Sequence, residues 1–175
     1  LNELVTVYKD LTAYDDSKAY MNDGGAKGKE LAAKYVAAVE KFDAAYAKFN
    51  ETLNKVNAEQ SKKQIEKLKK DGKKGYAAAM ESTLRLTELV DKLEKAPQNA
   101  DKAAVEKELS EIEALLKSIN NDRGQVLADR YNSVVGDVRQ VLADPSDNNL
   151  NNMIEGFNGY IDTYNSTTPD QFDAK

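Results

Sequence analysis

Apolar side chains recur every three or four residues along most of this chain, which is the spacing of a helix with one buried face. The longest run extends from about residue 26 to residue 71, and its apolar positions alternate between steps of four and three. These positions are Leu31, Tyr35, Val39, Phe42, Tyr46, Phe49, Leu53 and Val56. The spacing predicts a helix with a heptad-like seam that is the longest element of the chain.

Glycine and proline divide the rest of the chain into shorter helical runs. Their apolar positions cover about residues 1–20, 76–95, 105–119, 127–141 and 150–164. No alternation with a period of two is sustained, so strands are not expected. The pattern therefore predicts an all-α fold, an elongated antiparallel helical bundle with one very long helix and coiled-coil-like packing. We expect the apolar stripes, including the whole seam, to form its core.

The break at Pro97 leaves the topology open. In the preferred arrangement the helices on either side of this residue, over 76–120, together pair with the long helix. A true reversal at Pro97 is the alternative and gives shorter helices in a compact bundle. We expect a single helical-bundle domain over residues 1–165, with residues 51–95 as a projecting helical hairpin and residues 166–175 as a polar tail.

The composition argues against catalysis, metal binding and nucleic-acid binding. The chain has 175 residues, a net charge of -5, and neither histidine nor cysteine. Without these residues it lacks the usual general base and the usual ligands of zinc and copper. The acidic balance argues against nucleic-acid binding. We therefore expect no enzyme, no cofactor, no metal site and no nucleic-acid partner.

The glycine-rich segment from Gly24 to Lys29 invites comparison with a phosphate-binding loop. Such a loop needs G-x-x-x-x-G-K-[ST] after a strand, whereas here Gly28-Lys29 is followed by Glu30 and preceded by a helix. We predict a corner between two helices.

Residues 144–155 partly match a calcium-binding loop, but Asn149 stands where that loop requires glycine, so a capped helix start is the better prediction.

A cluster of lysines gives the chain a strong charge asymmetry. Residues 51–75 contain eight lysines against four acidic residues. Seven of these lysines form a candidate contact surface for an anionic partner: Lys62, Lys63, Lys67, Lys69, Lys70, Lys73 and Lys74. The alternative is that they only keep a helical surface soluble.

Two segments near the chain ends carry a family resemblance. Residues 11–31, LTAYDDSKAYMNDGGAKGKEL, and residues 153–166, MIEGFNGYIDTYNS, resemble motifs of a bacterial domain-of-unknown-function family. That family consists of helical envelope lipoproteins, the YiiG-like proteins among them. The resemblance implies attachment to a membrane on the periplasmic side, through a lipid-bearing cysteine upstream of Leu1, and supplies no known activity.

Two functions are consistent with the resemblance and the composition. The leading hypothesis is a non-catalytic envelope lipoprotein domain, a structural or binding module whose partner is a protein or another envelope component. The alternative is a periplasmic holdase-like chaperone that grips unfolded clients with a helical prong. The chain contains no apolar stretch long enough to span a membrane, and because it starts without methionine we expect a targeting segment upstream.

Overall fold

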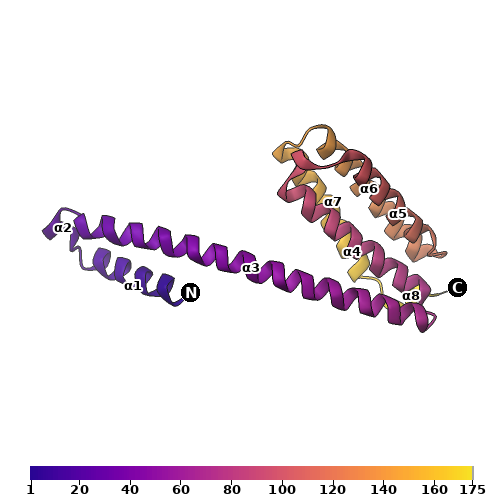
Figure 1. The fold of residues 1–175 in the computed structure, drawn as a ribbon, viewed down its shortest axis with the longest axis horizontal. Coiled ribbons are helices and arrows are strands. Elements are labelled where there is room, and N and C mark those ends of the chain that lie inside the picture. The colour runs from indigo at the N-terminus through magenta and orange to yellow at the C-terminus, as the bar shows by residue number, and fades with distance from the viewer. Residues whose placement is uncertain (175) are drawn as a thin grey trace. The chain divides into compact units, whose positions relative to one another are not determined.

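The computed structural model describes residues 1–174, and its regular elements are all helices (Figure 1). The all-α class and the bundle-like fold predicted from the sequence are thus confirmed. No helix among the described residues is both long and apolar enough to cross a membrane. The elements are α1 (Asn2–Asp16), α2 (Tyr20–Asp23), α3 (Ala26–Lys70), α4 (Lys74–Lys95), the 3-10 helix η1 (Pro97–Asn99), α5 (Lys102–Lys117), α6 (Asp122–Ala143), α7 (Asp147–Asn165) and α8 (Pro169–Phe172).

The chain forms two compact units, Leu1–Asn57 and Ala58–Lys175, and the boundary between them lies within α3. Helix α3 has 45 residues, which confirms that the long apolar run forms the longest element. The prediction that residues 1–165 act as one domain stays a prediction.

The first unit is a helical hairpin in which α1 packs against the N-terminal part of α3. The rings of Tyr8 and Tyr35 lie 6.4 Å apart between centroids, and Glu3 pairs with Lys41 at 2.8 Å. Within residues 1–57 the buried side chains are those of Leu31 and Ala38. This unit therefore has a thin core.

The second unit is built on a bundle of four antiparallel helices. Helix α4 packs on α5, α5 on α6, α6 on α7, and α7 returns to α4, which closes the ring (Figure 1). Each helix contributes one apolar stripe at heptad-like spacing. In α5 the stripe is Val105, Leu109, Ile112 and Leu116, and all four are buried as the sequence predicts.

The reversal at Pro97 decides this topology. Proline cannot continue a helix, so α4 ends at Lys95 and η1 turns the chain back, where Asp101 caps α5 by accepting hydrogen bonds from the backbone of Ala103 and Ala104. The preferred prediction, a broken pair lying along the long helix, was wrong, and the alternative holds. Helix α4 is accordingly a core helix with Val90 and Leu93 buried, and not one arm of a projecting hairpin over residues 51–95.

The C-terminal segment differs from the predicted polar tail. Phe172 in α8 is buried and stacks on the rings of Tyr76 and Tyr164, at 6.1 Å from each. The side-chain amide of Asn121 donates a hydrogen bond to the carbonyl of Phe172 at 2.9 Å. A side chain at position 75 would collide with that same carbonyl, so Gly75 allows the approach. One aromatic residue in a polar segment is enough to dock it.

We predict that Phe172→Ala lowers the free energy of unfolding by about 3 kcal/mol, because the substitution empties a buried aromatic site. Urea unfolding monitored by circular dichroism measures the effect. Ser166→Ala, an exposed change six residues earlier, is the control and should stay within about 0.5 kcal/mol of wild type. Equal stability of the two variants would contradict the docking of α8.

Candidate interaction surface

The glycine-rich segment forms the corner that the sequence predicts. Gly24 and Gly25 have φ angles of 63° and 84°, which favour glycine. The carboxylate of Asp23 accepts hydrogen bonds from the backbone N–H groups of Gly25 and Lys27, at 2.9 and 3.1 Å. The first turn of α3 is therefore capped by the chain itself, and its N–H groups are used in making the corner.

The Tyr14 hydroxyl completes this corner by donating a hydrogen bond to Asp23 at 2.6 Å. This bond, followed by those from the backbone N–H groups of Gly25 and Lys27, holds the pKa of Asp23 below its ordinary value of 3.8. Gly28 gives the ring of Tyr14 room, since a Cβ there would come within 2.8 Å of the ring. The corner joins α1 to α3 and is structural.

The segment that partly matches a calcium-binding loop is a capped helix start, as predicted. Ser146 is the N-cap of α7 and accepts a hydrogen bond from the backbone of Asn149. The side-chain amide of Asn149 donates to the backbone carbonyl of Asp144 at 2.8 Å. Within residues 1–174 no group of three or more acidic residues is placed to hold a metal ion.

The structure divides the seven lysines into two sets. Lys62, Lys69 and Lys73 pair with acidic residues of the second unit, respectively Glu88 at 3.9 Å, Glu81 at 2.7 Å and Asp170 at 2.8 Å. The other four, Lys63, Lys67, Lys70 and Lys74, are exposed and form no ion pair with any described residue.

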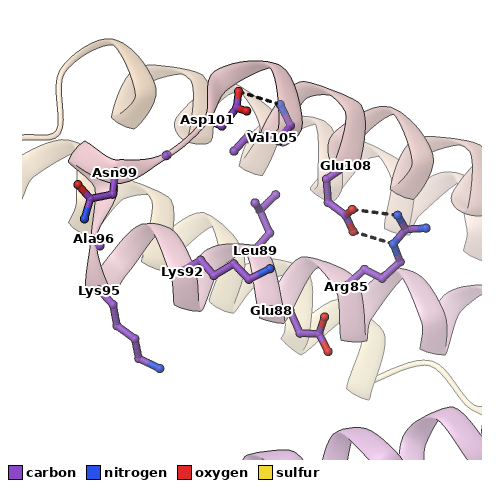
Figure 2. A pocket seen from close by; sticks show the side chains of 12 residues that line it. Arg85, Glu88, Leu89, Lys92, Lys95, Ala96, Asn99, Asp101, Val105 and Glu108 are labelled. Atoms are coloured by element: carbon purple, nitrogen blue, oxygen red, sulfur yellow. Dashed lines mark hydrogen bonds and ion pairs between the residues drawn. The ribbon is translucent and has the colours of Figure 1, made fainter.

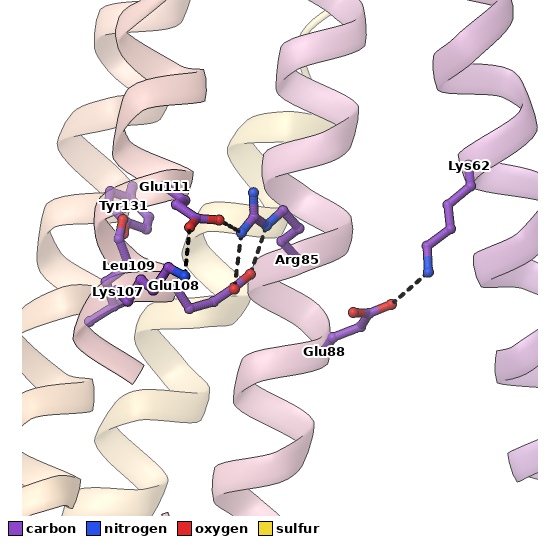
Figure 3. Close-up of polar contacts among 8 residues, drawn as sticks. All are labelled: Lys62, Arg85, Glu88, Lys107, Glu108, Leu109, Glu111 and Tyr131. Carbon is purple, nitrogen blue, oxygen red and sulfur yellow. Dashed lines mark hydrogen bonds and ion pairs between the residues drawn. The ribbon is translucent and has the colours of Figure 1, made fainter. Parts of the chain in front are cut away.

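The strongest polar cluster of the second unit lies between α4 and α5. Arg85 donates to both oxygens of Glu108, at 2.7 and 3.0 Å, and also to Glu111 (Figure 3). These bonds, the one to Glu108 above all, raise the pKa of Arg85 and hold that of Glu108 below its ordinary range. On the other side of α5, Arg139 binds Glu106 in the same two-pronged way. The carboxylates are thus occupied in joining helices.

A cleft of about 600 Å³ opens beside this cluster, between α4 and α5 near the reversal (Figure 2). Its apolar lining includes Leu89 and Val105, and its charged lining is evenly mixed, with three basic and three acidic side chains. Glu108 is held by Arg85, and Asp101 caps α5. The charges of the lining balance, so they do not favour a ligand of either sign.

The feature that stands out is the uncovered part of the α3 seam. Tyr46, Phe49, Leu53 and Val56 are 55%, 60%, 42% and 49% exposed, although they continue the stripe that α1 covers at Tyr35. We call these four residues the open seam. Isolated exposed apolar residues are ordinary, but a continuous row of this kind makes the open seam the candidate interaction surface.

The expectation that the whole seam forms core was wrong for this part of α3. A sequence signal for the difference exists, since the apolar positions of residues 1–20 are Leu1, Leu4, Val5, Tyr8 and Leu11, which is too short a stripe to cover residues 31–56. The structure places Glu3 opposite Lys41, so α1 begins there and cannot reach Phe49.

Fold and surface together define an all-α protein with a helical hairpin, a four-helix bundle and an exposed apolar helix face. Residues 1–129 match the family described as "Protein of unknown function (DUF3829)". The match covers more than half of the chain, so the chain belongs to this family. The predicted resemblance to a domain-of-unknown-function family is thus confirmed. No match was found among curated proteins or among solved structures.

We predict that Tyr14→Phe raises the pKa of Asp23 toward 3.8, because the substitution removes the first of the hydrogen bonds that favour the carboxylate. A depressed pKa stabilises the corner above that ordinary value, and this stabilisation is lost as the pH falls through the pKa of the folded state. NMR titration of the Asp23 carboxyl carbon measures the shift. Tyr46→Phe, on the open seam, is the control, and an unchanged Asp23 pKa in Tyr14→Phe would refute the corner geometry.

Proposed function

We propose that this protein is a non-catalytic binding module of the bacterial cell envelope whose open seam holds a helical partner. The exposure of Tyr46, Phe49, Leu53 and Val56 carries this proposal. A helix with apolar residues at alternating steps of four and three offers the knobs and holes that a second helix requires. The partner is therefore an amphipathic helix of a protein and not a small molecule.

Attachment to the envelope is proposed from the family resemblance. The motif in residues 11–31 resembles that of envelope lipoproteins, and the chain belongs to a family of unknown function. A lipid-bearing cysteine upstream of Leu1 would anchor the protein on the periplasmic side of a bacterial membrane. The helix-binding surface would then act close to a bilayer.

Two observations support a non-catalytic role. The chain has no histidine or cysteine, so an acid–base or nucleophilic mechanism would have to rely on other residues. The carboxylates gathered between α4, α5 and α6 form ion pairs with Arg85 and Arg139. The net charge of -5 likewise favours protein or envelope partners over nucleic acid.

The same exposed seam favours a second candidate, a holdase-like chaperone. An apolar helix face can bind unfolded chains without selecting one partner. The two candidates differ in what occupies the seam, which is one defined helix in a binding module and many different clients in a holdase.

We predict that a photoreactive phenylalanine at position 49 of the full-length protein, expressed in its bacterium, cross-links to one partner in the membrane fraction. The reason is that Phe49 lies at the centre of the open seam. The same probe at Lys48, which is one residue away and off the seam, is the control. A discrete adduct at position 49 supports a binding module, whereas a smear of many masses supports the holdase. Equal labelling at both positions, or recovery outside the membrane fraction, counts against the proposal.

We further propose that three of the free lysines face the anionic surface of a membrane. Lys63, Lys67 and Lys70 follow one another at steps of four and three on α3, so they share one helix face. The buried Ile65 points to the opposite side. Lysines near an anionic bilayer contribute about 1 kcal/mol each, so three of them give a weak, salt-sensitive attraction that supplements a lipid anchor.

We predict that replacing Lys63, Lys67 and Lys70 by Gln weakens binding to vesicles of phosphatidylglycerol and phosphatidylethanolamine by about tenfold or more at low salt. Co-sedimentation with the vesicles measures it. The matched control replaces Lys62, Lys69 and Lys73, which are already paired, and both variants lie three charges below the wild-type -5. If both variants lose the same amount of binding, the net charge explains the attraction to the vesicles and the lysine face of α3 does not.

A further inference from the structure

We infer that the helix held by the open seam is α3 of a second copy of this chain, lying antiparallel to the first. This inference rests on the proposed function and names the partner of the same surface. It follows from the order of apolar residues along α3, from the charges beside them and from the place where α1 begins.

The seam is complementary to itself when two copies run in opposite directions. In heptad terms Val39, Tyr46 and Leu53 occupy one apolar position, and Phe42, Phe49 and Val56 the other. Suppose that Tyr46 of one copy lies level with Phe49 of the other. Phe42 then lies level with Leu53, and Val39 with Val56, and each layer occurs twice. Each of these three layers thus joins two apolar side chains.

The residues that flank the seam do not oppose such a pair. Beside these layers Asp43 falls next to Asn50 of the second copy, and Ala45 falls next to Thr52. No like charges meet, and Asp43 is the single charged side chain among these four flanking positions. The lysines Lys48 and Lys55 lie on the outer side of the helix. A pairing surface of a helix has this distribution.

The position of α1 selects the antiparallel arrangement. Because Glu3 pairs with Lys41, the start of α1 lies level with residue 54 of the second copy in this register. Leu1 and Val5, which are exposed on α1, would therefore be covered near Val56 of the other chain. In a parallel pair the two α1 helices would lie at the same level, and neither would come close to Val56 of the other copy.

The surface is large enough for a dimer of moderate affinity. Aromatic side chains present about 150–250 Å² each, so the half-exposed Tyr46 and Phe49, together with the smaller Leu53 and Val56, offer roughly 300–400 Å² per copy. Two copies would remove about 700 Å² of apolar surface from water. Since about 60% of a typical interface is apolar, the total reaches roughly 1,200 Å², the lower end of the range for stable pairs.

Sedimentation equilibrium of residues 1–175 over a concentration series tests the inference. We expect the mass to rise toward twice 19.4 kDa, and Phe49→Gln with Leu53→Gln to raise the dissociation constant by about tenfold or more. Lys48→Gln with Asn54→Gln, two exposed residues on the outer side of the same helix, is the control and should dimerise like wild type. Circular dichroism checks that all three proteins keep their helices.

Cysteine cross-linking tests the direction of pairing, since residues 1–175 contain no cysteine. A mixture of Ala45→Cys and Thr52→Cys chains of different tag length should form the mixed disulfide dimer, and neither variant alone should cross-link to itself. Self-linked dimers of either variant would overturn the antiparallel arrangement.

The outcomes separate this inference from the proposed function. A wild type that stays monomeric, or a photo-adduct at position 49 with the mass of another protein, overturns the second copy as partner while the seam remains a binding surface. A dimer that the double Gln substitution leaves unchanged overturns the assignment of the seam to self-pairing. A photo-adduct with the mass of two copies supports both.

Discussion

The reversal of the chain after α4 is the constraint on which the larger unit depends. Pro97 cannot continue a helix, Asp101 starts the next one within a few residues, and α5 lies back along α4. Once these two helices pair, α6 and α7 complete a ring whose apolar stripes face one another. Arg85 and Arg139 then tie α5 to its two neighbours. Such exposed or half-exposed ion pairs set the register of the helices and add little to the stability of the bundle.

The sequence predicts the helices of this bundle well because each stripe finds a partner of similar length. Leu127, Tyr131, Val134, Val138 and Val141 are all buried in α6, as their spacing predicts. In α7 the buried centre is Met153 and Tyr160, one position away from the row of Leu150, Ile154, Phe157 and Ile161 that the spacing suggests. Periodicity identifies the apolar face of a helix but not the line along it that lies deepest, because neighbouring helices decide that.

Topology and the docking of the tail lay beyond sequence reasoning for a different reason. Whether a proline bends a chain or reverses it depends on which packing buries more apolar surface, and the residues next to Pro97 do not tell. Phe172 is a single aromatic in a polar segment, and its site exists only once Tyr76 and Tyr164 have been brought together. The glycine at position 75 is explained only by the carbonyl that approaches it. Contacts between distant parts of a sequence decide all three features.

The thin core of the first unit bears on what the open seam does. Within residues 1–57 only Leu31 and Ala38 are buried, and α1 has 15 residues, close to the length at which an isolated helix is marginal in water. A partner that covers Phe49 and Leu53 would add to this core the apolar contacts that the hairpin lacks. Such a partner would couple binding to the folding of this unit, because a ligand that binds only the folded form stabilises that form. Under the proposed function the exposed residues are one side of a core, and the partner would supply the other side.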